Sequence, residues 1–73
     1  MKQSLVVVDP NILAGHPVIK GTRIPVSLIL NLLAHGYSFQ QIIEEYPEIS
    51  FAAIKDALSY AEERIKREQI FSV

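Results

Sequence analysis

Two helix starts and one forced break fall in the middle of the chain, and they limit the folds open to it. Ser38 and Gln41 have the spacing of a capping box, in which the hydroxyl and the side-chain amide each satisfy a backbone N–H. Pro47 lacks an amide hydrogen and disfavours the helical conformation of the preceding residue, so this helix spans about 39–46. Ser50 then provides a second N-cap. Two short-linked helices predict a helix-turn-helix.

Apolar residues at helical spacing extend this pattern in both directions. Pro25 suits the first turn of a helix at about 26–35, and Gly36 can adopt the positive φ that ends it. Leu30 lies off the apolar face of that helix, which indicates a second buried surface. The third helix, about 51–67, is the longest, and its apolar stripe consists of Ile54, Leu58, Ala61 and Ile65.

The first 25 residues form an extended N-terminal arm with β-prone runs. Residues 5–8 are apolar and β-branched on both faces, which predicts a short strand covered on both sides. Residues 18–24 contain two further runs around Lys20-Gly21, so we expect a small hairpin or an irregular extended arm. The fold class predicted for residues 1–73 is mainly α: one three-helix, homeodomain-like or winged-helix-like helix-turn-helix domain with a short N-terminal β-element and a short C-terminal tail.

Composition adds a requirement for a partner. A chain of 73 residues buries only about 60% of its unfolded surface. Yet 49% of the residues are hydrophobic and none is cysteine, so no disulfide supports the core. We therefore expect a homodimer or a complex with another protein. The N-terminal apolar run is too short for a signal peptide or a membrane span, which predicts a cytoplasmic protein.

The sequence offers little for catalysis. It has no cysteine nucleophile, no recognisable Ser-His-carboxylate set and no phosphate-binding glycine loop. His16 and His35 have no third ligand at metal spacing and are interpreted as structural or surface residues. Glu44, Glu45 and Glu48 are interpreted as a solvated face, because nothing makes them converge on one ion. We expect no catalytic residue, no metal and no cofactor, and therefore no enzyme.

Nucleic-acid binding has a small set of candidates. If the N-terminal arm follows a DNA groove, Lys20, Thr22 and Arg23 would contact phosphates. An alternative of equal weight is that these residues only build a turn and keep it soluble. On the third helix, Lys55 and Ser59 lie near the start and would reach bases or phosphates. The outward-facing carboxylates of Asp56, Glu62 and Glu63 would oppose this binding by repelling the phosphates. The net charge of −1 also argues mildly against DNA. The candidate DNA-binding residues are Lys20, Thr22, Arg23, Lys55 and Ser59.

Four segments together resemble domain-of-unknown-function family 433: residues 9–12, 15–26, 36–38 and 46–47. The resemblance covers about residues 5–65, and its most specific run is Gly-x-Pro-x-Ile-x-Gly-Thr-Arg-Ile-Pro-Val. It implies a small bacterial or archaeal protein with a three-helix fold, commonly dimeric, often similar in role to VapB antitoxins with a PIN-like ribonuclease as partner. It brings no catalytic residues. The signature residues are Gly15, Pro17, Gly21, Thr22, Arg23 and Pro25, which makes the arm a candidate dimer or partner surface.

Two functional hypotheses follow. The first is a dimeric antitoxin that binds its own operator DNA and neutralises a PIN-like ribonuclease. Under this hypothesis the apolar residues of the C-terminal tail contact the toxin, namely Ile70, Phe71 and Val73. The second is a protein–protein interaction module that keeps the three-helix shape without contacting nucleic acid.

Overall fold

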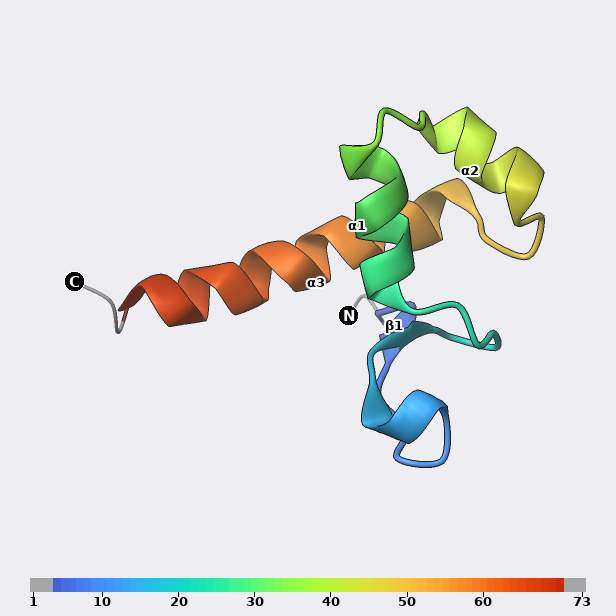
Figure 1. Ribbon diagram of the computed structural model, residues 1–73. Helices are drawn as coiled ribbons and strands as arrows, with labels where there is room; N and C mark the ends of the chain where they lie inside the picture. The colour runs from blue at the N-terminus through green and yellow to red at the C-terminus, as the bar shows by residue number, and fades with distance from the viewer. Residues whose placement is uncertain (1–3, 71–73) are drawn as a thin grey trace.

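Three helices and a two-stranded antiparallel sheet form the fold (Figure 1). The computed structural model describes the backbone of residues 4–70 and the side chains of residues 4–67. In chain order the elements are strand β1 (Val6–Val7), 3₁₀ turn η1 (Leu13–Gly15), strand β2 (Val18–Ile19), and helices α1 (Val26–Ala34), α2 (Phe39–Glu45) and α3 (Phe51–Ile70). The predicted mainly helical class with a short N-terminal β-element is confirmed.

The predicted caps set the boundaries of α2 and α3. The Ser38 hydroxyl accepts a hydrogen bond from the Gln41 amide at 3.1 Å, and the Ser38 amide donates to the Gln41 side-chain oxygen at 2.8 Å. This is the reciprocal capping box. Helix α2 ends before Tyr46, as the following proline requires. The Ser50 hydroxyl accepts from the Ala53 amide at 3.1 Å at the start of α3. Both predicted helix starts are therefore confirmed.

The arm folds into a hairpin that is paired on one side with β1. The Ile19 amide donates to the Ile24 carbonyl at 3.0 Å, and the Val26 amide donates to the Pro17 carbonyl at 2.9 Å. Gly21 has a φ of +80° at the tip of this hairpin, which a residue with a Cβ would adopt only with strain. Of the two alternatives for the arm, the hairpin is the one present.

Strand β1 is shorter and less covered than predicted. It pairs with β2 in the register Val6 to Ile19 and Val7 to Val18. Val6 is buried, whereas Val8 is 57% exposed. The prediction of a strand covered on both faces along residues 5–8 was wrong, because a two-residue pairing leaves the chain beyond it outside the core.

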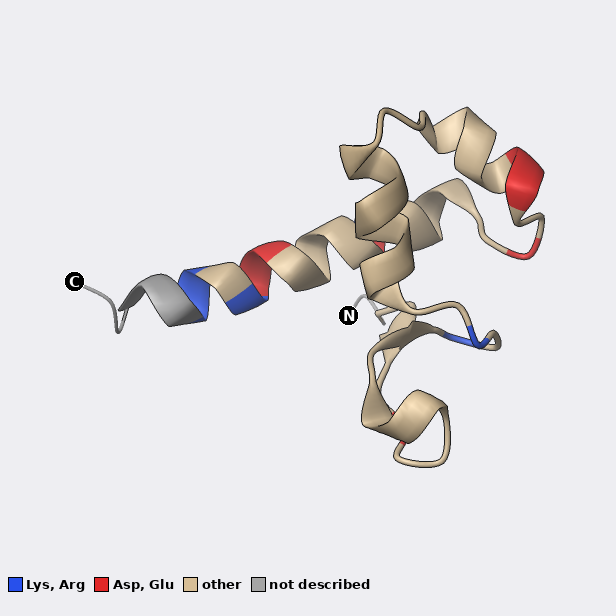
Figure 2. Cartoon of the chain, in the orientation of Figure 1, with Lys and Arg blue, Asp and Glu red and all other residues tan. Residues whose placement is uncertain are grey.

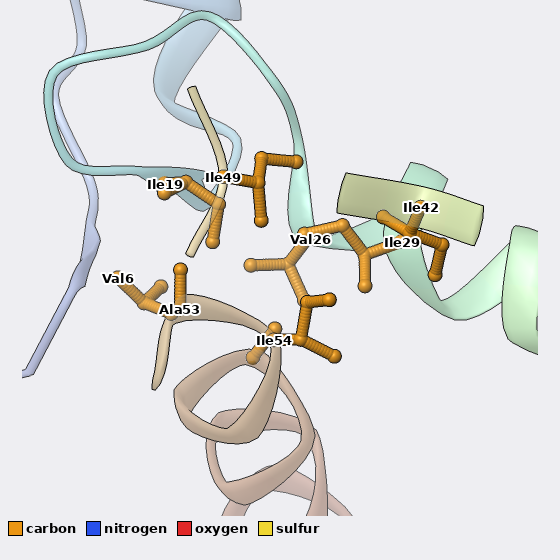
Figure 3. Packing of buried hydrophobic residues seen from close by; sticks show 9 residues of the cluster. Val6, Ile19, Val26, Ile29, Ile42, Ile49, Ala53 and Ile54 are labelled. Carbon is orange, nitrogen blue, oxygen red and sulfur yellow. The ribbon is translucent and has the colours of Figure 1, made fainter. Parts of the chain in front are cut away.

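The core lies where α1, α2, β1 and β2 meet the first half of α3 (Figure 3). Its largest fully buried side chains are those of Ile29, Ile42, Ile49, Ile54 and Val18. Burying one such side chain stabilises the fold by about 1.5–3 kcal/mol. The last of these residues is Ile54, in the first turn of α3, so the large side chains of the core come only from the beginning of that helix.

The second half of α3 projects from this body (Figure 1). The helix also runs to Ile70, past the predicted end at 67, so that tail residue is helical; Phe71 and Val73 lie outside the described residues. The apolar stripe predicted on this helix is fully buried only at Ile54, and its later residues are less covered. Leu58 is 38% exposed and Ile65 is 55% exposed, because the body covers only the beginning of a 20-residue helix. Along residues 4–70, no helix has the length and apolar character needed to cross a bilayer.

Candidate interaction surface

The hairpin residues divide into a structural threonine and two exposed cations. The Thr22 hydroxyl donates to the Ile19 carbonyl at 2.8 Å and accepts from the Ile24 amide at 3.0 Å. Its polar group is therefore used inside the turn. Lys20 and Arg23 are both exposed beside it. Thr22 therefore builds the turn, which is one of the two alternatives, whereas contact of Lys20 and Arg23 with phosphates stays a prediction.

On α3, the predicted outward residues Lys55 and Ser59 are exposed, but Asp56 is not. Asp56 is only 7% exposed, and its carboxylate accepts a hydrogen bond from the Leu5 amide at 2.9 Å. The prediction that Asp56 faces outward was wrong. A buried carboxylate requires hydrogen-bond donors, and the backbone before β1 supplies one. Asp56 therefore fastens the N-terminal sheet to α3 instead of opposing an anionic ligand.

The charges near the helix-turn-helix are unfavourable for a nucleic acid. Glu44, Glu45 and Glu48 are exposed at the end of α2 and in the turn that leads to α3. Figure 2 shows the hairpin cations well apart from the cations on the projecting half of α3. In the described part of the chain the basic residues are thus dispersed, and an approaching phosphate backbone would meet carboxylates beside the turn.

An open apolar groove of about 290 Å³ runs between α1 and the second half of α3. Leu30, which the sequence placed off the main apolar face of α1, lines it and is half-buried against the core, so the second buried surface predicted from this residue stays a prediction. At one side Arg64 lies 5.8 Å from the centre of the Tyr60 ring, a cation–π distance. We call this the α1–α3 groove; it is lined by His16, Pro17, Val26, Ser27, Leu30, Tyr60, Ala61, Arg64 and Ile65.

Three exposed large apolar side chains follow α3 at intervals of seven residues: Phe51, Leu58 and Ile65, which we call the α3 stripe. Phe51 is 56% exposed, and its ring packs on one side against Phe39 with 5.0 Å between ring centres. Phe51 was not among the predicted surface residues, because its place in the sequence indicated only the first residue of a helix. The seven-residue spacing to Leu58 was the signal that would have identified it.

The two histidines have different surroundings. The His35 ring nitrogen Nδ1 is 2.8 Å from the Asn31 carbonyl oxygen at the end of α1, a local helix-end contact. His16 is exposed and borders the α1–α3 groove. Within residues 4–67, no three His, Asp or Glu side chains gather closely enough to hold a metal ion.

A second hollow of about 410 Å³, which Ser59 helps to line, lies along α3 beside Ser4.

The chain was compared with known proteins. A curated relative, "Uncharacterized protein y4eO" of Sinorhizobium fredii (strain NBRC 101917 / NGR234), is 37% identical over 60 residues. The match takes in 82% of this chain but 27% of the relative, so the chain spans about a quarter of that protein's length. This domain-sized region therefore also occurs inside a longer polypeptide.

A solved structure has the same fold. It is the crystal structure of a DUF433 member protein from Anabaena variabilis ATCC 29413, with a TM-score of 0.78 and 28% sequence identity. The alignment covers 90% of this chain and 68% of the other. The model of the family described as "Protein of unknown function (DUF433)" matches residues 6–61, from β1 to the point where α3 leaves the body. The chain belongs to the DUF433 family.

Proposed function

We propose that this domain is a non-enzymatic, homodimeric, cytoplasmic module of the antitoxin type, which binds a PIN-like ribonuclease through the α1–α3 groove. The observation that carries the proposal is the groove itself. Leu30, Ala61 and Ile65 give it an apolar lining, in which Ile65 is exposed and the other two are half-buried. Tyr60 and Arg64 supply a polar edge. An apolar centre with a polar rim is the composition typical of a protein-binding surface.

The position of the groove also supports a protein partner. Its lining residues on α3, from Tyr60 to Ile65, belong to the half of the helix that continues to Ile70. A ribonuclease held there would contact α1 and α3 together, and then the residues that follow the helix. The occurrence of a similar region in a longer relative fits a module that is combined with other chains or domains.

The proposal is tested by looking for a gene for a PIN-like ribonuclease beside this one; its product is co-expressed with the chain and assayed on a single-stranded RNA. We expect co-purification of the two proteins and loss of RNA cleavage. Ala61→Glu places a carboxylate in the groove and is expected to restore cleavage, because an unpaired buried charge opposes docking. Ser59→Glu adds the same charge on an exposed part of α3 outside the groove and should still inhibit. A ribonuclease that stays active with the unmodified chain would overturn the proposal.

Operator binding is a second candidate function, favoured by the exposure of Lys55 and Ser59 on the second helix of a helix-turn-helix. The dispersed cations and the carboxylates beside the turn lead us to expect weak binding with a steep salt dependence. The test is a gel shift with the DNA upstream of the gene at low salt. Loss of the shift in both Lys55→Glu and Arg23→Glu would establish DNA contact at these residues. An unchanged shift in both would assign any retardation to another surface.

A further inference from the structure

The α3 stripe points to a specific mode of self-association, which rests on the homodimeric form of the proposed function. We propose that α3 packs antiparallel against α3 of a second copy, with the two-fold axis at Leu58. The stripe residues repeat every seven positions, the spacing of one heptad position in a helix pair. They drift by only about 20° per heptad around the helix, so all three face one partner helix.

The intervening heptad positions face the chain's own body. Ile54 is fully buried in the core, and Ala61 is half-buried in the lining of the α1–α3 groove. A partner helix would therefore contact a narrow seam built on Phe51, Leu58 and Ile65, about 21 Å long at 1.5 Å per residue. All three side chains of this seam are exposed, Phe51 by 56%, Leu58 by 38% and Ile65 by 55%. Phe39 supports Phe51 from the side of α2.

The charges beside the seam select the antiparallel arrangement. Leu58 is equidistant in sequence from Phe51 and Ile65, so a two-fold axis there sets Phe51 opposite Ile65 of the second copy. Lys55 and Glu62 occupy the same flank, one heptad apart, and are both exposed. In an antiparallel pair this flank lies against the same flank of the second copy. Lys55 of each copy is then next to Glu62 of the other, which gives two ion pairs.

A parallel pair lacks this complementarity. There the flank of Lys55 and Glu62 would face the opposite flank, which carries Ser50, Ala57 and Arg64 and no carboxylate for Lys55. Ala57 is fully buried in the chain's own core, so the middle of that flank is not open to a partner helix. The existing pair between Glu62 and Lys66, 3.4 Å long and well exposed, does not compete strongly, because such surface pairs contribute little.

The oligomeric state of the full chain tests the seam. Sedimentation velocity at micromolar concentration should give a dimer, with helical content checked by circular dichroism in every variant. Leu58→Glu should weaken association at least tenfold, whereas Ser59→Glu, the same change one position away, should leave the dimer intact. Lys55→Glu alone and Glu62→Lys alone should each weaken association, and the double swap should restore it. A dimer unaffected by Leu58→Glu, or a monomeric unmodified chain, would refute the inference.

Orientation is tested by disulfide trapping, which is clean because the chain has no cysteine. Phe51→Cys and Ile65→Cys, mixed under mild oxidation, should form the mixed disulfide, since each faces the other across the seam. Phe51→Cys oxidised alone should stay uncrosslinked; an efficient homodisulfide would indicate a parallel pair and refute the proposal. A dimer that fails to inhibit the ribonuclease would overturn the proposed function but not this inference. A monomer that inhibits it, and loses inhibition in Leu58→Glu, would assign the stripe to the ribonuclease instead.

Discussion

Replacing Asp56 by alanine removes the carboxylate that accepts a hydrogen bond from the Leu5 amide at 2.9 Å. Asp56 is 7% exposed, so water does not readily occupy the site of the removed carboxylate. The Leu5 N–H then loses its hydrogen-bond acceptor. A hydrogen bond to a charged group contributes about 1.5–3 kcal/mol. For a domain of this size each kcal/mol corresponds to about 4–8 °C in Tm, so we expect Asp56→Ala to lower Tm by about 6–24 °C.

Thermal unfolding followed by circular dichroism measures this effect at one fixed protein concentration, because self-association would make Tm depend on concentration. Asp56→Asn keeps an uncharged acceptor and should lose less stability than Asp56→Ala. The control is Glu63→Ala, which removes an exposed carboxylate from the same helix and should change stability by no more than about 0.5 kcal/mol. If Asp56→Ala behaves like Glu63→Ala, the assigned role of Asp56 in fastening the sheet is refuted.

Three further changes test the local structure by urea unfolding. Thr22→Val removes the hydroxyl that joins Ile19 to Ile24 and should destabilise the fold by about 1–2 kcal/mol, whereas Thr22→Ser should be close to the parent; equal losses would contradict the turn role. Ser38→Ala removes half of the capping box and should cost about 1 kcal/mol, and a change near zero would argue against the cap. Ile42→Ala leaves a cavity at a fully buried position and should cost about 2–5 kcal/mol; a cost below 1 kcal/mol would place this residue outside the core.

The parts of the fold that the sequence predicted correctly are those set by neighbouring residues. The capping box at Ser38, the break before Pro47 and the second cap at Ser50 involve side chains within a few positions of their partners. Such signals are complete in a short stretch of sequence. The same holds for the hairpin around Gly21, whose positive φ follows from its place in a tight turn.

The errors concern contacts between distant parts of the chain. Helical periodicity placed Leu58 and Ile65 on the same stripe as Ile54, but it carries no information on how far the other elements extend along α3. Asp56 was placed outward because its partner, the Leu5 amide, lies 51 residues away. The candidate surface was foreseen only in part: Leu30 indicated a second apolar face, whereas the α3 stripe emerged from the exposure of Phe51.

The hydrogen bond between Asp56 and Leu5 also has a consequence for synthesis of the protein. During translation Leu5, which precedes β1, leaves the ribosome before α3 has been made, so its amide has no Asp56 carboxylate to bind. Closing a contact over so many residues carries a large entropic penalty, which nearby packing must offset first. The segment before β1 therefore lacks this hydrogen bond until α3 has left the ribosome.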